Sequence, residues 1–380
     1  MCQTIVNLNM TSREGLNLSD IKLAIDSANA EEKIWNYAQF GPLEENDIVI
    51  VVQVHTRLLY LRHLISSLQK SKHIEKVLLI FSHDVYYPEI NSVIQAIDFC
   101  KVLQIFYPFS IQLHPSSFPG QDPYDCPRDM KKEKAVNMKC NNANFPDLYG
   151  HYREAKFTQT KHHWWWKINH VFDGLRVTRN HTGLFLFLEE DHYVVEDFLH
   201  SLALLEKVQR RECKHCNVLS LGTYVKVVNY AADSGRAEIW QWISSKHNMG
   251  MAFNSATWKD IKSCAEKFCF FDDYNWDWSL QYISASCLQH KLIVMLVKAP
   301  RVYHIGECGV HHKKKDCASN SEINKVLRLS KAAVSHLYPT RLLATHSTKR
   351  MGKIPKGNGG WGDIRDRQLC MWHANITDIR

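Results

Sequence analysis

Three consecutive carboxylates, Glu189 to Asp191, follow the apolar run Leu184–Leu188. Such an uninterrupted apolar run is typical of a strand that is covered on both faces. Acids packed at its end repel one another and lose solvation, which costs free energy unless a cation compensates their charge. A hard divalent ion such as Mn²⁺ or Mg²⁺ prefers carboxylate oxygens and leaves positions open for a substrate phosphate. The segment therefore predicts either a nucleotide–metal site at the end of a central strand or a solvated acidic loop.

The elements that would position these acids begin with a regular alternation of strands and helices. Apolar runs and helical spacing predict three strands and two helices in turn, at 47–54, 58–68, 76–81, 90–97 and 102–106. This order is typical of a parallel, nucleotide-binding half-sheet in an α/β protein. The turn after the first strand reads Gln53-Val-His-Thr-Arg57 and lacks the glycines of a P-loop or a dinucleotide-binding fingerprint.

The middle of the chain holds an irregular segment followed by a helix rich in tryptophan. Residues 107–150 contain six prolines, so we expect a long excursion that a Cys126–Cys140 bridge would hold in place. Helical spacing predicts a helix over about 152–175 with an apolar stripe through Trp164 and a polar stripe through Lys167. The polar stripe faces either solvent or an anionic ligand, whereas the tryptophans are expected mainly in the core.

The composition indicates a globular protein of the secretory pathway. The 380 residues carry a formal net charge of +8, but neither an arginine-rich segment nor a nucleic-acid motif accompanies it, so we expect no nucleic-acid partner. Twelve cysteines and four glycosylation sequons favour disulfides over zinc binding, with Cys100 as a buried free thiol. Because no apolar run reaches 18 residues, we expect a membrane anchor upstream of a lumenal stem at 1–45.

Four motifs carry a resemblance to a known family. They are Lys161-His-His-Trp-Trp-Trp166, Leu188-Glu-Glu-Asp-His192, Asp272-Asp-Tyr-Asn-Trp-Asp-Trp278 and Gly359-Gly-Trp-Gly-Asp363. Over about residues 46–370 the chain closely resembles the N-acetylglucosaminyltransferase II family. The resemblance implies a GT-A fold, Mn²⁺ as cofactor and a Golgi type II membrane enzyme with a lumenal catalytic domain. It also implies inverting transfer of GlcNAc from UDP-GlcNAc to the α-1,6-arm mannose of an N-glycan, which forms a β-1,2 linkage.

The acidic motif of the resemblance identifies the expected metal ligands. Asp191 is expected to bind the metal directly, and His304, at the end of a strand-like segment, is expected to be a second ligand. We expect Glu189 and Glu190 to shape the site through hydrogen bonds or contacts with the ribose. A single histidine among 21 would otherwise more often be structural.

Uridine is expected over the carboxyl ends of the first half-sheet. The candidates are the residues after the first strand, Gln53, Val54, His55, Thr56 and Arg57. Asp84 follows the second strand and either accepts a hydrogen bond from the uracil N3–H or caps the next turn. The tryptophan-rich helix contributes further candidates for contact with donor or acceptor, namely Gln159, Thr160, Lys161, His162 and His163.

Inversion requires one base that removes the proton of the attacking mannose 2-hydroxyl. Asp277 is the expected base because Trp276 and Trp278 flank it, and tryptophans suit packing against a sugar face. It also lies near the expected N-terminus of a helix, which favours an ionised carboxylate. Asp272 and Asp273 are the rival bases.

Residues 46–380 are expected to form the catalytic domain, with 46–191 mainly the donor half and 192–380 mainly the acceptor half. Three alternatives remain at this point. A related transferase would act on another acceptor arm, and a secreted lectin would use the same acids and aromatics without needing a nucleotide half-sheet. A metallohydrolase would want a denser set of His and Asp ligands.

Overall fold

The computed structural model describes residues 17–224, 227–307, 321–348 and 356–375. Across them runs a large sheet with the strand order β1-β4-β3-β2-β5-β9-β7-β10-β8-β12. These strands are β1 Ile34–Trp35, β2 Val49–Val54, β3 Leu78–His83, β4 Lys101–Phe106, β5 Phe185–Glu189, β7 Val218–Ser220, β8 Arg236–Gln241, β9 Met251–Phe253, β10 Ile293–Val297 and β12 Leu343–His346. A second, small sheet pairs β6 (His192–Val194) with β11 (Val302–His304) in antiparallel orientation.

The first half of the large sheet is the parallel half-sheet that the sequence predicts. Strands β4, β3, β2 and β5 are mutually parallel, and Gln53 on β2 lies beside Glu189 on β5. The chain builds outward from β2 through β3 to β4 and then returns to add β5 on the other side of β2. The order of the strands therefore reverses between β2 and β5. In open α/β sheets, ligands bind outside the carboxyl ends of the strands at such a point.

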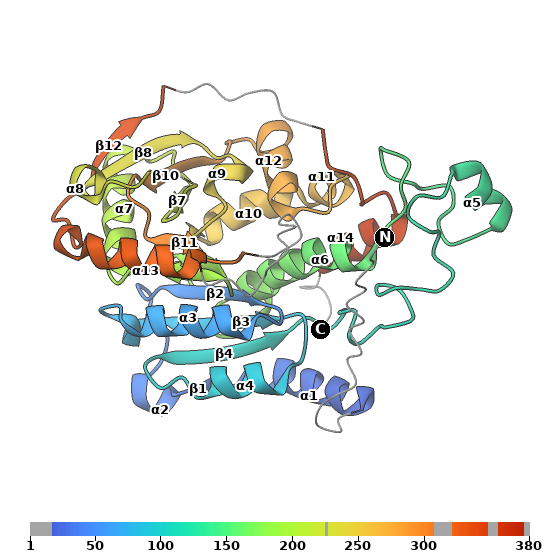
Figure 1. The fold of residues 1–380 in the computed structure, drawn as a ribbon, viewed down its shortest axis with the longest axis horizontal. Helices are drawn as coiled ribbons and strands as arrows, with labels where there is room; N and C mark the ends of the chain where they lie inside the picture. The colour runs from blue at the N-terminus through green and yellow to red at the C-terminus, as the bar shows by residue number, and fades with distance from the viewer. Residues whose placement is uncertain (1–16, 225–226, 308–320, 349–355, 376–380) are drawn as a thin grey trace.

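The helices cover this sheet on both faces, which explains its uninterrupted apolar strands. On one face, Val49 and Val51 belong to a core that includes Trp164 of α6 (Ala155–Asn169) and Leu280 of α12 (Trp276–Ser286). On the other face, Ile50 and its neighbours pack with α3 (Leu58–Gln69), α4 (Pro88–Gln95) and α7 (Phe198–Glu212). In Figure 1, α6 runs between the blue first half and the yellow and orange second half.

The remaining helices complete the two layers and one excursion. They are α1 Leu18–Glu31, α2 Tyr37–Phe40, α5 Lys132–Met138, α8 Tyr230–Asp233, α9 Ser244–His247, α10 Ser255–Ser263, α11 Ala265–Phe270, α13 Ser321–Ala333 and α14 Ile364–Ala374. The excursion around α5 extends to the side of the molecule in Figure 1. None of the described helices combines the length and the apolar character needed to cross a membrane.

The later part of the expected stem packs against the sheet. Helix α1 buries Ile25, and the Asn29 side chain donates to the Phe106 carbonyl and accepts from the Phe106 amide. Asn36 donates to the carbonyls of Ile97 and Cys100, while β1 pairs with β4. Residues 18–40 thus form hydrogen bonds with backbone groups at the β4 edge of the sheet. The weak apolar pattern of this segment did not indicate such packing.

Disulfides join several distant segments. The expected Cys126–Cys140 bridge is confirmed, and the further pairs are Cys213–Cys216, Cys264–Cys287 and Cys269–Cys370. Cys100 is a buried free thiol, as expected. Cys2, Cys308 and Cys317 lie outside the described residues.

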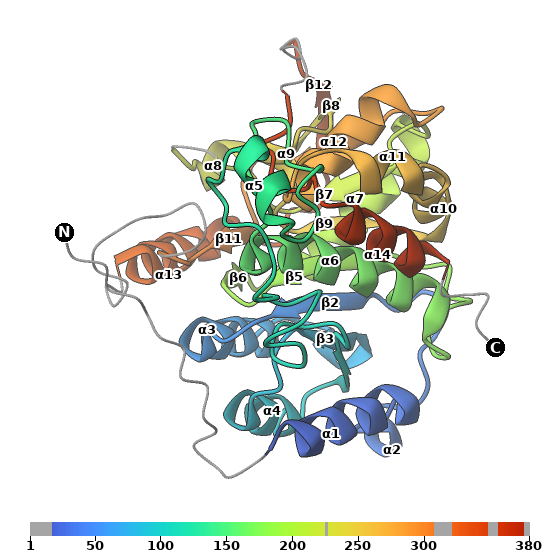
Figure 2. The ribbon, with the colours of Figure 1, turned by 90° about the vertical axis from the view of Figure 1, so that its right-hand side faces the viewer.

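The C-terminal helix α14 lies alongside α6, as Figures 1 and 2 both show. The Trp165 indole on α6 donates to the Cys370 carbonyl at 3.0 Å, and the Cys269–Cys370 bridge ties α14 to α11. Three segments that are far apart in sequence therefore meet beside the tryptophan-rich helix.

Candidate active site

The acidic segment at the end of β5 is compensated by one arginine from the turn after β2. The side chains of Glu190 and Asp191 are buried, and both contact Arg57. Arg57 donates from Nε to Glu190 at 2.7 Å and from a terminal nitrogen to Asp191 at 2.6 Å. Glu190 also accepts from the His55 amide at 2.8 Å. The parallel pairing of β2 with β5 brings these residues together, so the acids and the predicted donor-binding turn form one site.

His304 reaches the same carboxylate from the second sheet. The antiparallel pairing of β11 with β6 places His304 beside His192, one residue after Asp191. The His304 Nε2 atom lies 2.9 Å from Asp191 Oδ2. Burial alone would raise the pKa of Asp191, but the His304 hydrogen bond and the Arg57 charge hold it well below its usual range. The structure thus brings the two expected metal ligands into direct contact, and Asp191 is ionised.

The donor set fits a divalent metal ion. The second oxygen of Asp191 is buried and has no hydrogen-bond partner among the described residues. Glu189, Asp191 and His192 offer ligand atoms that all lie within 4.8 Å of one another. Carboxylates with imidazole suit Mn²⁺. A Cβ at Gly306 would lie 2.2 Å from Asp191 Oδ2, so only glycine leaves room for that carboxylate. Sequence reasoning did not single out His192.

A buried lysine on α6 contacts the carboxyl end of β2. Lys167 is 1% exposed, and its ammonium donates to the Gln53 side chain at 2.7 Å. Burial lowers the pKa of Lys167, and the charge of Glu189 opposes that shift. At Lys167, the polar stripe of this helix is therefore buried. The Lys167 side chain runs through the core and ends at the carboxyl ends of the strands.

Asp84 gathers a second group of predicted donor-site residues. His55 Nδ1 lies 2.7 Å from one Asp84 oxygen, and the Gln159 amide donates to the other at 2.9 Å. The Asp84 charge raises the pKa of the half-exposed His55 to about 9. Val54 is buried and contributes its carbonyl, which accepts from the Asp84 amide, whereas Thr56 is partly exposed. The ends of β2 and β3 and one turn of α6 therefore converge here.

Three further predicted residues of α6 are buried and bonded within the protein. Lys161 donates to two backbone carbonyls, His162 lies 2.9 Å from Asp366, and His163 lies 2.8 Å from the Ser82 hydroxyl. In this structure they are not placed for the direct substrate contact expected from the sequence. Thr160 and Gln159 are partly exposed, and of these two Gln159 bonds Asp84.

Asp277 occupies the first turn of α12. One of its oxygens accepts from the Trp278 amide at 3.0 Å and the other from the Asn248 side chain at 3.1 Å. Burial raises the pKa of Asp277 to about 7, and the nearby charges of Asp273 and Glu189 add to the shift. A carboxyl group with this pKa can change protonation state near neutral pH. Sequence reasoning missed Asn248, because nothing local links it to Asp277.

The rival carboxylates already serve the backbone. Asp272 accepts from the amides of Trp361 at 3.0 Å and Leu148 at 2.6 Å. Asp273 is fully buried and accepts from the amide and side chain of both Asn275 and Asn358. Each of their four oxygens thus accepts a backbone amide of a loop, whereas one oxygen of Asp277 accepts only the Asn248 side chain. Asp277 is therefore the candidate base in this segment.

The aromatic residues around Asp277 differ in their placement. Trp276 is 8% exposed and stacks on Trp164 with ring centroids 4.3 Å apart, so it packs in the core. Trp278 is partly exposed.

Comparison with known proteins assigns the chain to a family. The profile of N-acetylglucosaminyltransferase II (MGAT2) matches residues 22–370. The chain belongs to this family. It is therefore a glycosyltransferase, and its α/β fold contains the parallel half-sheet expected from the sequence.

Relatives from animals and plants match over most of the chain. The alpha-1,6-mannosyl-glycoprotein 2-beta-N-acetylglucosaminyltransferase of Rattus norvegicus is 47% identical over 92% of this chain and 79% of its own length. The protein of that name from Homo sapiens is 44% identical over 92% and 78%, and that from Arabidopsis thaliana is 36% identical over 89% and 77%.

Solved structures show weaker similarity. S. aureus TarS (residues 1–349) has a TM-score of 0.35 and 11% sequence identity, covering 76% of this chain and 65% of that one. A mannosyltransferase from Pyrobaculum calidifontis has a TM-score of 0.29 and 10% identity, covering 95% and 86%. Similarity at this level supports no statement about individual residues.

Proposed function

We propose that this chain transfers GlcNAc from UDP-GlcNAc to the 2-hydroxyl of the α-1,6-arm mannose of an N-glycan, forming a β-1,2 linkage with inversion. The reaction type and arm follow the shared name of the relatives. The observation that carries the residue-level proposal concerns Asp277, whose pKa is raised to about 7 and which accepts a backbone amide at only one oxygen. Both oxygens of Asp272 and of Asp273 accept backbone amides.

The donor is proposed to bind at the carboxyl ends of β2, β3 and β5. Asp191 and His304 would hold Mn²⁺, and Glu189 and His192 would complete or support the site. Bound there, the ion supplies Lewis-acid stabilisation of the negative charge that develops on the diphosphate. Arg57 and His55 add positive charge at the same edge, and Asp84 is proposed to accept from the uracil N3–H.

Asp277 is proposed to act on the acceptor. As the mannose 2-hydroxyl oxygen bonds to the anomeric carbon of GlcNAc, the bond to UDP breaks and the hydroxyl proton passes to Asp277. Asn248 and the Trp278 amide hold its two oxygens, which fixes the carboxylate for this step. No second catalytic carboxylate is required, because the nucleophile is the acceptor hydroxyl and the leaving group is UDP. The partly exposed Trp278 is the aromatic residue proposed to contact the sugar.

The compartment belongs to the same proposal. Disulfides between described cysteines suit the oxidising lumen of the secretory pathway. We propose that the enzyme works in the Golgi lumen and that a segment outside this chain anchors it to the membrane.

The test is GlcNAc transfer from UDP-GlcNAc to a trimannosyl N-glycan that already carries GlcNAc on its α-1,3 arm. The assay is run with Mn²⁺ and with a chelator, and the linkage of the product is determined. Metal-dependent β-1,2 addition to the α-1,6 arm supports the proposal. Addition to another arm, or hydrolysis of the donor without transfer, would contradict it.

A further inference from the structure

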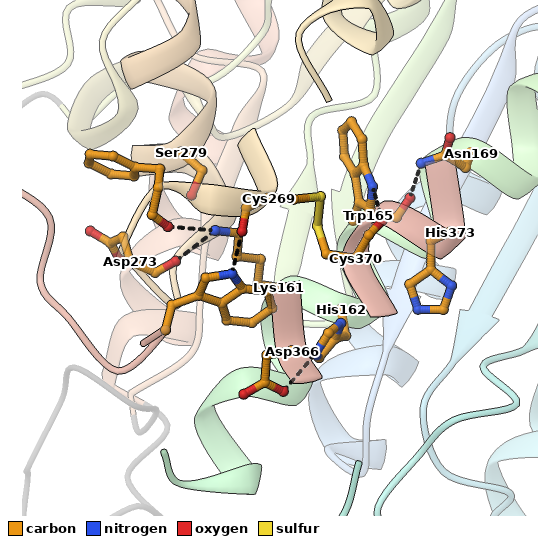
Figure 3. The surroundings of a disulfide bond; sticks show 12 residues. Lys161, His162, Trp165, Asn169, Cys269, Asp273, Ser279, Asp366, Cys370 and His373 are labelled. Atoms are coloured by element: carbon orange, nitrogen blue, oxygen red, sulfur yellow. Dashed lines mark hydrogen bonds and ion pairs between the residues drawn. A yellow bond between two sulfur atoms is a disulfide. The ribbon is translucent and has the colours of Figure 1, made fainter. Parts of the chain in front are cut away.

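Lys161 is a buried lysine of α6 that the proposed chemistry does not use. Its side chain is fully buried, and its ammonium donates to the carbonyls of Phe271 at 3.1 Å and Asp273 at 2.9 Å (Figure 3). The nitrogen lies 4.3 Å from the centroid of the Trp361 ring and 5.1 Å from that of Phe268. Burying an ammonium group costs free energy, and an apolar residue of the same volume often serves a core as well. The position therefore calls for a role that depends on the two carbonyl contacts.

These contacts fix the segment immediately before the candidate base. The Phe271 carbonyl also accepts from the Asp273 amide at 2.8 Å, so Lys161 bonds a turn that is already closed. The Asp273 carboxylate in turn accepts from the Asn275 amide and side chain at 2.8 and 2.9 Å. Asn275 is the residue before α12, which begins at Trp276. A chain of bonds thus runs from Lys161 through the 271–275 segment to the helix that carries Asp277.

The other end of this chain of bonds is a rigid support. The neighbouring His162 lies 2.9 Å from Asp366 on α14, and Arg153 binds the same carboxylate at 2.9 Å. The Cys269–Cys370 bridge joins α14 to α11, whose last residue, Phe270, precedes the segment that Lys161 holds (Figure 3). Lys161 therefore projects from a helix that is fixed on both sides.

We infer that Lys161 is a positioning residue for sugar transfer: through the carbonyls of Phe271 and Asp273 it sets the start of α12 and hence the place of the Asp277 carboxylate. This inference rests on the proposed role of Asp277 as the base. It assigns Lys161 to the acceptor side, acting through the backbone, in place of the direct substrate contact that the sequence predicts.

The test compares two buried lysines. Lys161→Met keeps an unbranched side chain but removes the donor, and Lys101→Met is the matched control. Lys101 is 2% exposed and pairs with Asp47 at 3.3 Å at the start of β4, the opposite end of that strand from the site. UDP-binding sites are counted by calorimetry with Mn²⁺, so that kcat is expressed per correctly folded molecule. Melting temperatures are measured for both variants.

The expected result is a split between kcat and KM. Lys161→Met should lower kcat per UDP-binding site by roughly 10–100-fold, since small misplacements of reacting groups have effects of that size. Its KM for UDP-GlcNAc should stay within about 2-fold, because the donor end does not depend on this contact. Lys101→Met should have a lower melting temperature than the wild type and an unchanged kcat per UDP-binding site. Wild-type kcat per site in Lys161→Met would overturn the inference.

A second variant covers the case in which Lys161→Met does not fold. Asn358 is exposed, and its side chain donates to the Asp273 oxygen at 2.8 Å. Asn358→Ala removes that bond from the same chain of contacts, so kcat should fall by about 3-fold with KM for the donor unchanged. Unchanged kcat in Asn358→Ala would contradict transmission through Asp273.

Asp277→Asn separates this inference from the proposed function. If Asp277→Asn retains transfer, the proposed base is wrong and the inference fails with it. If Asp277→Asn loses transfer while Lys161→Met keeps wild-type kcat per site, the base stands and only the positioning role fails.

Discussion

The two acidic segments of this enzyme differ in what compensates their charge. Asp191 at the end of β5 is bonded by the charged side chains of Arg57 and His304, and Glu190 is bonded by the Arg57 side chain and by two backbone amides. Asp272 and Asp273 before α12 are bonded by backbone amides and by asparagine side chains. The first arrangement places charged side chains where a metal ion and a diphosphate could bind, whereas the second fixes a loop.

This difference shows why a cluster of acids in a sequence does not by itself define a catalytic group. Asp191 keeps one buried oxygen without a partner among the described residues, which suits a metal ligand. Every oxygen of Asp272 and Asp273 accepts a backbone amide, which suits a structural role. Asp277 belongs to neither group, because its pKa near 7 leaves it able to accept a proton.

The largest expected effect is that of Asp277→Asn. Loss of the base should lower kcat by about 10²–10⁴-fold, the range for one general base. Affinity for UDP with Mn²⁺ should stay near the wild-type value, since Asn preserves the shape of the residue and the donor binds elsewhere. Steady-state kinetics and calorimetry measure the two quantities. Loss of UDP binding along with transfer would place Asp277 on the donor side.

Asp191→Ala should act at the other segment. Removing a direct metal ligand should weaken Mn²⁺-dependent binding of UDP by at least about 100-fold, more than the loss of a supporting residue would. Calorimetric titration with UDP, with and without Mn²⁺, gives the affinity. Gly306→Ala is a companion variant, because the added Cβ would lie 2.2 Å from the Asp191 oxygen and displace it. Unchanged UDP affinity in Asp191→Ala would remove it from the metal site.

The pH profile should distinguish the two segments without mutation. The pKa of Asp277 is raised to about 7, and only its deprotonated form can accept a proton. The value of kcat/KM should therefore rise with pH, by about 10-fold per unit below pH 7, and level off above it. The ionised Asp191, whose pKa lies well below its usual range, should not contribute in this window. A profile that is flat from pH 5.5 to about 7.5 would speak against Asp277 as the base.

Asp272→Asn should have the smallest effect on chemistry. The change leaves one oxygen for the Trp361 amide or the Leu148 amide but not for both. Thermal unfolding should show a loss of about 1 kcal/mol, the contribution of one hydrogen bond. The value of kcat per UDP-binding site should stay within about 3-fold of wild type, since the Asp272 side chain bonds Leu148 and Trp361 and takes no part in the bonds from Lys161 to Asn275. A loss of transfer as large as that of Asp277→Asn would restore Asp272 as a rival base.

The strands of the first half were predictable from sequence because helices cover both of their faces. The runs around Val49 and Phe185 are uninterrupted for that reason, and their order led to the parallel half-sheet. The acidic segment was predictable for the same reason, since it follows one of these strands directly.

The surroundings of α6 were not predictable in this way. The partners of Lys161, His162 and Lys167 are Asp273, Asp366 and Gln53, each more than 100 residues away in sequence. Periodicity shows that these positions share a face but not that the face is buried. The same holds for Trp276, whose ring stacks on Trp164 of another helix. Contacts with residues distant in sequence thus determine which polar and aromatic side chains are buried and which stay exposed.

The most direct test of the division between the two segments is a crystal structure of the enzyme with UDP, Mn²⁺ and the trimannosyl acceptor. The metal should lie on Asp191 and His304, and the mannose 2-hydroxyl should lie within about 2.6–3.2 Å of Asp277. A metal bound by Asp272 or Asp273, or a 2-hydroxyl that contacts a different carboxylate, would contradict the account.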